Sequence, residues 1–156
     1  MPSYRSAIAV GVMSVLAISQ AGFAAEDWPD SVDDFIAQVR KTIDTTDMDG
    51  FLAAVKNPNG ALLLDVREES ELKLGHVPGT LNIPRSVLEL RIWRTLGYPD
   101  RVDVNRKIYV LCRTGRRAIL SAKQLKDIGF TNVTAVVMEL ADWQQKGLPF
   151  VKDETK

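Results

Sequence analysis

Three continuous apolar runs constrain the fold of this chain more than any other feature of its sequence. They occupy residues 61–66, 107–111 and 133–137. Apolar and polar residues do not alternate in these runs, as expected for strands that are covered on both faces. Segments with apolar residues at helical spacing lie between or after them, at residues 87–92, 119–129 and 140–147. This order predicts an α/β domain with a mainly parallel central sheet and helices on both faces.

Two shorter segments raise the expected sheet to about five strands. One runs through residues 80–83 and the other through residues 42–44. The second lies between two short helices, of which the first follows Ser31 as its N-cap and the next begins near Asp47. Sheets of this kind bind ligands at the carboxyl ends of their strands, so residues that directly follow a strand are candidate site residues.

The N-terminal residues have the composition of a signal peptide. Arg5 precedes an apolar run at residues 7–18, which is too short to span a bilayer as a helix, since that takes about 20 residues. Small residues at Gly22 and Ala24 suit cleavage after Ala24. We therefore expect export to the periplasm. An uncleaved segment that tethers the domain to the membrane, or a buried helix, is the alternative.

The length and charge indicate one domain without a nucleic-acid partner. A chain of 156 residues fits a single core, and 20 basic against 20 acidic side chains leave no global basic field. The expected division is a signal peptide at residues 1–24, a helical extension at 25–41, the main domain at 42–151 and a tail at 152–156. No membrane partner is expected after the signal is removed.

Cys112 is the only cysteine and directly follows a predicted strand. Residues 112–117 read C-R-T-G-R-R, and the next helix is expected to begin at Arg117 or Ala118. Free backbone N–H groups and the positive end of that helix favour a thiolate and attract an anion. Gly115 lets the amides converge, and Arg117 can bind an oxyanion through two nitrogens. Alternatively, the lone cysteine is a small buried apolar residue and the arginines are solvated.

Three segments together resemble the rhodanese-like sulfurtransferases over residues 42–151. Residues 62–68 read L-L-L-D-V-R-E, residues 75–84 read G-H-V-P-G-T-L-N-I-P, and residues 112–117 are similar to the active-site loop C-R-x-G-x-R of that family. The resemblance implies the rhodanese-like α/β fold and a single-domain, exported thiosulfate sulfurtransferase. It also implies that no cofactor or metal is needed.

The resemblance further implies the roles of the site residues. Cys112 accepts the sulfane sulfur of thiosulfate or a similar small anionic donor and becomes a persulfide. It then passes the sulfur to a thiophile such as cyanide or a thiol, or to a sulfur-accepting protein. The substrate-binding residues are those of the loop, Arg113, Thr114, Gly115, Arg116, Arg117 and Ala118. Ala118 departs from the serine or threonine common in the family, which removes a hydroxyl from the expected contacts to bound sulfur.

Two other functions are compatible with the same residues. The first is a persulfide carrier or binding module that acts without turnover and delivers sulfur to an envelope partner. The second is a cysteine phosphatase or an arsenate-type relative, because phosphatases share the fold. They use a C-x5-R loop, whereas Cys112 and Arg117 give C-x4-R. The shorter loop favours a sulfur-sized target.

Polar residues outside the loop are expected to be structural. His76 is the only histidine, but a thiolate stabilised by amides and arginines needs no imidazole base. Asp65 ends a buried strand, so its carboxylate needs hydrogen bonds from nearby loop amides. Arg67 is expected to form a surface pair with Glu68 or Glu71.

Overall fold

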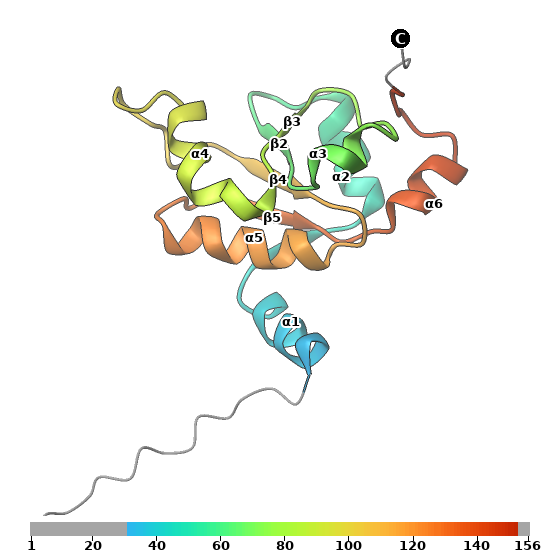
Figure 1. Ribbon diagram of the computed structural model, residues 1–156, viewed down its shortest axis with the longest axis horizontal. Coiled ribbons are helices and arrows are strands. Elements are labelled where there is room, and N and C mark those ends of the chain that lie inside the picture. Colours follow the sequence, from blue (N-terminus) through green and yellow to red (C-terminus); the bar gives the residue numbers. More distant parts are fainter. Residues whose placement is uncertain (1–30, 153–156) are drawn as a thin grey trace, which may run out of the picture.

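The computed structural model describes residues 31–152 of the chain. Its centre is a five-stranded sheet in the order β1-β5-β4-β2-β3, and every neighbouring pair of strands is parallel (Figure 1). The strands are β1 (Asp44–Thr46), β2 (Leu62–Asp65), β3 (Thr80–Asn82), β4 (Ile108–Leu111) and β5 (Val133–Val136). The helices are α1 (Val32–Arg40), α2 (Met48–Lys56), α3 (Glu69–Leu72), η1 (Arg85–Val87), α4 (Leu88–Thr95), α5 (Arg116–Asp127) and α6 (Leu140–Gln145). The predicted parallel α/β class is confirmed.

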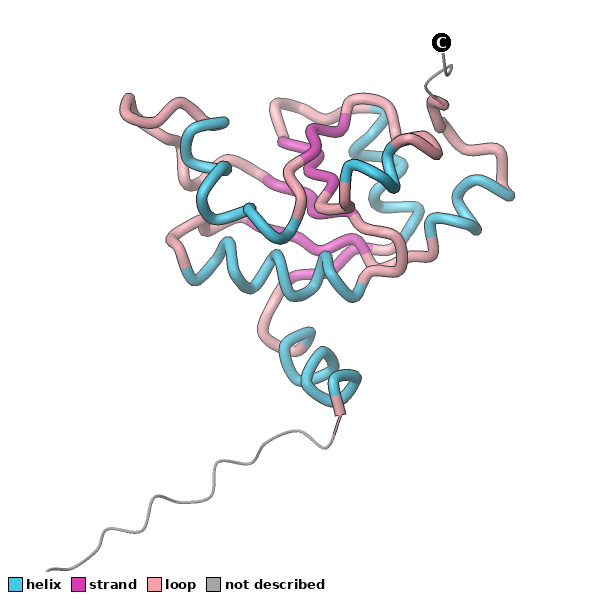
Figure 2. Tube along the Cα trace, in the orientation of Figure 1, coloured by secondary structure: helices cyan, strands magenta, loops and turns pink. Residues whose placement is uncertain are grey.

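Helices cover both faces of this sheet, and the central strands divide their side chains between the two layers. In β2, Leu62 and Leu64 belong to the core beneath α1, α4 and α5, whereas Leu63 belongs to the core beneath α2 and α6. Figure 2 shows the strands lying between these two groups of helices. Because both faces are buried, the strand needs apolar residues at successive positions, which explains its continuous apolar run.

The boundaries differ from the expected ones at three places. The first strand begins at Asp44, two residues later than predicted, because the amide and hydroxyl of Thr42 both donate to the carbonyl of Val39 and still belong to the end of α1. Helix α5 begins at Arg116, one residue earlier than predicted. Helix α3 was not predicted, because its four residues are too few to show a helical period.

A buried ion pair closes the end of β2. The guanidinium of Arg67 donates to Asp65 from Nε at 2.9 Å and from Nη2 at 2.7 Å, and the backbone amide of Arg67 donates to the same carboxylate at 3.0 Å. The expected surface pair of Arg67 was therefore wrong. Its side chain is 3% exposed, because the carboxylate that ends a buried strand needs a charged partner inside the protein.

The same arginine ties the strand to a second segment of the chain. Nη2 of Arg67 donates to the carbonyl of Gly75 at 3.1 Å, and the neighbouring His76 exchanges backbone hydrogen bonds with Val151 at 2.7 and 2.8 Å. A Cβ atom on Gly75 would lie 2.2 Å from the ring of Phe150. Residues 150–151 are thus held against the loop that contains His76, which gives that histidine a backbone role.

The predicted signal peptide lies outside the described residues, and the division of the chain into segments stays a prediction. Within residues 31–152, no helix combines the length and the apolar character needed to cross a membrane.

Candidate active site

The loop at residues 112–115 connects the carboxyl end of β4 to the first turn of α5. Gly115 is the N-cap of α5 and has a φ of 80°, in the left-handed region. A Cβ atom at this position would lie 3.1 Å from the Cα of Val137 and 3.4 Å from the carbonyl oxygen of Val136. Glycine is therefore required both by the backbone conformation and by the close approach of the loop to the end of β5.

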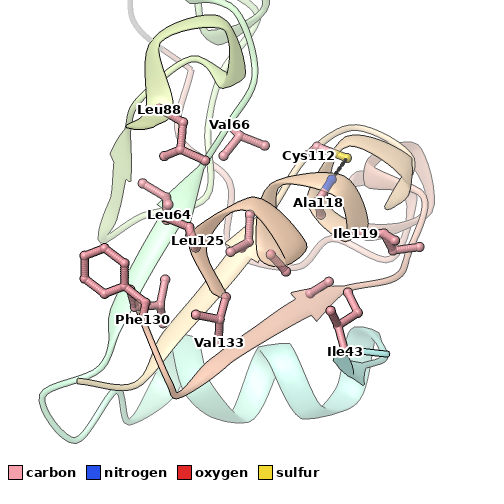
Figure 3. Packing of buried hydrophobic residues seen from close by; sticks show 14 of the residues in the cluster. Ile43, Leu64, Val66, Leu88, Cys112, Ala118, Ile119, Leu125, Phe130 and Val133 are labelled. Carbon is pink, nitrogen blue, oxygen red and sulfur yellow. Dashed lines mark hydrogen bonds between the residues drawn. The ribbon is translucent and has the colours of Figure 1, made fainter. Parts of the chain in front are cut away.

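The sulfur of Cys112 lies at the first turn of α5. Cys112 is 1% exposed, and its Sγ accepts a hydrogen bond from the amide of Ala118 at 3.4 Å (Figure 3). Ala118 itself is fully buried, so its contribution to the site is this amide. The first amides of a helix have no partner within the helix, and one of them here points at the sulfur.

The other amides of the loop are available to a ligand. Within the described residues, none of the amides of residues 113–117 donates to a protein acceptor. They precede or begin a helix of 12 residues, whose dipole adds to their attraction for an anion. Thr114 is half-buried in the middle of this loop. The geometry therefore offers an anion cradle next to the sulfur.

The three arginines of the loop point to three different places. Arg113 is exposed, and its carbonyl accepts from the amide of Leu140 at 2.8 Å. Arg116 pairs with Asp33 of α1. Arg117 donates from both terminal nitrogens to the carboxylate of Glu71, at 2.6 and 2.8 Å. The guanidinium groups of Arg116 and Arg117 thus engage acidic partners, and within the described residues the Cys112 sulfur accepts from an amide and not from an arginine.

Glu71 is the residue that sequence reasoning missed. It was considered as a partner of Arg67, yet it belongs to Arg117, 46 positions away. No local sequence pattern indicates this partner, because it follows from the pairing of strands β2 and β4: neighbouring parallel strands end at one edge of the sheet, so the segments that follow them meet there. Glu71 follows β2 as part of α3, and Arg117 follows β4 in α5.

The pair of Glu71 and Arg117 is held in its charged form. Hydrogen bonds from Arg117 lower the pKa of Glu71 from 4.5 to about 2, against a smaller opposing effect of burial, and the amide of Glu68 acts in the same direction. The hydrogen bonds to Glu71 likewise raise the pKa of Arg117, and the negative charge of a Cys112 thiolate adds to this. Arg117 is therefore sensitive to the charge on the sulfur as well as to Glu71.

A small cavity of about 160 Å³ lies beside Glu71. Its lining combines Glu71 and Arg113 with apolar side chains, among them Leu74, Leu140 and Phe150. Within residues 31–152, no three side chains of histidine, cysteine, aspartate or glutamate come together in a way that would hold a metal ion.

Comparisons with known proteins place this domain in a family. The model of the rhodanese-like domain family matches residues 48–146. The Bacillus subtilis protein YrkF is 32% identical over 99 residues, which cover 64% of this chain and 50% of YrkF. The thiosulfate:glutathione sulfurtransferase of Saccharomyces cerevisiae is 25% identical over 99 residues, which cover 59% of this chain and 70% of the yeast protein. The chain therefore spans only half the length of YrkF.

The structural comparison supports the fold. A Rhodopseudomonas palustris protein of unknown function, described as a possible tyrosine phosphatase, superposes with a TM-score of 0.67. It is 22% identical, and the match covers 82% of this chain and 99% of the other. At this identity the likeness concerns the fold alone.

Proposed function

Since the chain belongs to the rhodanese-like domain family, we propose that it is a sulfurtransferase that carries sulfane sulfur on Cys112. The observation that carries this proposal is the position of the Cys112 sulfur, which accepts a hydrogen bond from the amide of Ala118 at the start of α5. Helix N-termini and converging amides stabilise a thiolate, which is the nucleophilic form of cysteine. The thiosulfate:glutathione sulfurtransferase of yeast supports the same reaction class.

The transfer takes place in two balanced steps. The Cys112 thiolate attacks the outer sulfur of thiosulfate, a new S–S bond forms, and sulfite leaves with the electron pair of the old one. The amides of residues 113–117, which have no acceptor among the described residues, bind the negative charge of the donor. The thiolate of an acceptor then attacks the outer sulfur of the Cys112 persulfide, and the Cys112 thiolate leaves. No external oxidant or reductant is consumed.

The burial of Cys112 favours sulfur donors over phosphate esters. Only 1% of its surface is exposed, so a reagent has little access to the sulfur. Thiosulfate presents a terminal sulfur atom that bears no oxygens and can be attacked from its outer side. A phosphoryl group must instead be attacked at its central atom, which is surrounded by oxygens. We therefore favour sulfur transfer over phosphatase activity as the function of this site.

A persulfide carrier without turnover is the second candidate. The observation that favours it is the contact of both terminal nitrogens of Arg117 with Glu71. Because Arg117 is already paired, an anionic donor gains less binding free energy at this site than it would from a free guanidinium. A protein that only stores sulfur for a partner needs no tight site for thiosulfate.

Intact-mass measurement tests the proposal directly. The wild-type protein and its Cys112→Ser variant are incubated with thiosulfate. We expect the mass of the wild type to increase by one sulfur atom and the mass of the variant to stay unchanged. Cys112→Ser is a matched control because it replaces a single sulfur atom by oxygen, and Cys112 is the only thiol of the chain. Steady turnover with cyanide or glutathione would identify an enzyme, and one equivalent of transfer would identify a carrier. An unchanged mass with hydrolysis of an aryl phosphate would contradict sulfur transfer.

We also propose that the protein is exported. The support is the sequence alone: Arg5, the apolar run at residues 7–18 and the small residues at Gly22 and Ala24. Mass determination of the protein from the periplasmic fraction of a Gram-negative host should give a chain that begins at Ala25. Recovery of the full-length chain from the membrane fraction would instead support an uncleaved tether.

A further inference from the structure

The carboxylate of Glu71 uses both of its oxygens on Arg117. Oε2 accepts from Nη1 at 2.6 Å and Oε1 accepts from Nη2 at 2.8 Å. Oε2 also accepts from the amide of Glu68 at 3.2 Å, which fixes the side chain at the start of α3. The two side chains are only 25% and 32% exposed. Three hydrogen bonds therefore hold the Glu71 carboxylate, yet a small solute can reach the pair.

This geometry neutralises the guanidinium that feels the charge of the Cys112 sulfur. A sulfonate and a carboxylate present similar charged oxygens to a guanidinium. A donor that contacts Arg117 has to displace Glu71 and leave that carboxylate without its partner. A donor that leaves the pair intact meets a group without net charge and loses the attraction of a free guanidinium. Both costs increase with the charge of the donor.

The cavity beside Glu71 offers a different kind of contact. Leu74, Leu140 and Phe150 line it together with Arg113. Apolar groups that enter such a cavity are removed from water, which favours binding. Thiosulfate has no apolar group to place there. An organic donor has one, and Arg113 remains to balance a single negative charge.

From these contacts we propose that Glu71 determines donor specificity, and that it favours singly charged organic sulfane donors, such as thiosulfonates, over dianionic thiosulfate. The inference rests on the proposed sulfur transfer at Cys112. With a thiosulfonate, the Cys112 thiolate forms a bond to the terminal sulfur and the organic sulfinate leaves with the electron pair. Glu71 takes no part in these bonds. It acts through Arg117 and is a positioning residue.

Steady-state kinetics with two donors test this proposal. Thiosulfate and benzenethiosulfonate carry two and one negative charges, and cyanide is the acceptor for both. Glu71→Gln removes the charge at nearly constant shape, and Glu71→Asp restores it. Glu69→Gln is the matched control, because Glu69 is an exposed glutamate of the same helix without an ion pair among the described residues.

The expected result is a change in KM that depends on donor charge. In Glu71→Gln, the KM for thiosulfate should fall about tenfold and that for benzenethiosulfonate about threefold, because electrostatic free energy is proportional to charge. The kcat should stay within about twofold, since the reacting atoms are untouched. Glu71→Asp and Glu69→Gln should keep the donor preference of the wild type. An unchanged or increased KM for thiosulfate in Glu71→Gln would overturn the inference.

Alkylation of Cys112 separates this inference from the proposed function. Iodoacetate and iodoacetamide are similar in size and differ by one negative charge. The rate with iodoacetate divided by the rate with iodoacetamide should rise in Glu71→Gln. It should keep its wild-type value in Glu69→Gln, whether or not sulfur is transferred. If the ratio rises but neither donor adds sulfur, the proposed function fails and the charge selection stands. If sulfur is transferred and the ratio is constant, the inference fails and the proposed function stands.

Discussion

The segments that follow β2 and β4 each place an arginine on a carboxylate, but they do so in different surroundings. After β2, Arg67 and Asp65 are 3% and 0% exposed. After β4, Arg117 and its partner Glu71 are 32% and 25% exposed. A buried pair cannot open without leaving a charge inside the protein, whereas water can solvate the members of a half-exposed pair. The first pair therefore serves the fold, and the second is available to a ligand.

Breaking the buried pair should have the largest effect. Asp65→Asn leaves Arg67 charged and without its ion-pair partner in the interior, and we expect a loss of about 3 kcal/mol in the free energy of unfolding. Urea denaturation measures this loss. The double variant Asp65→Leu/Arg67→Met removes both charges and should recover most of the stability. If Asp65→Asn costs no more than Glu71→Gln, the contrast between the two loops is wrong.

The second largest effect should come from the glycine that shapes the loop after β4. Gly115→Ala adds a side chain where φ is 80° and where Val137 lies 3.1 Å away, and we expect a loss of about 2 kcal/mol. Gly79→Ala is the matched control, since Gly79 has the same φ of 80° and no atom within 4 Å of the added Cβ. Thermal unfolding of both variants isolates the steric contact. If both variants lose the same stability, the close contact of residue 115 with Val137 contributes nothing to the loss.

The half-exposed pair should contribute less and should do so in a pH-dependent way. Glu71→Gln is expected to cost about 1 kcal/mol near neutral pH, since water screens a pair of this exposure. The folded protein holds the pKa of Glu71 at about 2, below its ordinary value of 4.5. The unfolded chain therefore binds the proton first, and the stabilisation is lost as the pH falls from 4.5 towards 2.

Urea denaturation of the wild type and Glu71→Gln over this pH range measures that loss. The difference between the two proteins should shrink towards zero at the acidic end. A difference that does not change with pH would show that the carboxylate contributes through its shape and not through its charge.

The smallest effect is expected for Arg116, the first residue of α5. Arg116 and Asp33 are 56% and 61% exposed, and a pair of this kind contributes less than about 0.5 kcal/mol. A double-mutant cycle with Arg116→Gln and Asp33→Asn measures the coupling, which should decrease further at high salt. A coupling larger than that of Arg117 and Glu71 would reverse the ranking of the arginines by exposure.

The sequence was sufficient to predict the frame of the fold. The continuous runs at β2, β4 and β5 need burial on both faces, and that requirement alone implies helices on each side of a parallel sheet. Cys112 was placed correctly after β4 for the same reason, because the end of an apolar run marks the end of a strand. Local patterns of this kind are readable without coordinates.

The partners of the charged residues were not readable in this way. Arg67 was expected on Glu68 or Glu71 because these lie close in sequence. The choice of Asp65 instead depends on which side chains face the interior at the end of β2. The pairing of Glu71 with Arg117 depends on the adjacency of β2 and β4 in the sheet. The first is a consequence of burial and the second of strand order, and strand order has no local signature in the sequence.

The backbone bridge between His76 and Val151 has a consequence for the evolution and engineering of this domain. It makes Phe150 a wall of the cavity next to Glu71, although the strands and the cysteine loop are complete many residues earlier. The shape of that cavity can therefore be altered by exchanging the C-terminal segment alone. Phe150 also packs against the core cluster that contains Trp143, so such an exchange acts on the cavity and on the core together.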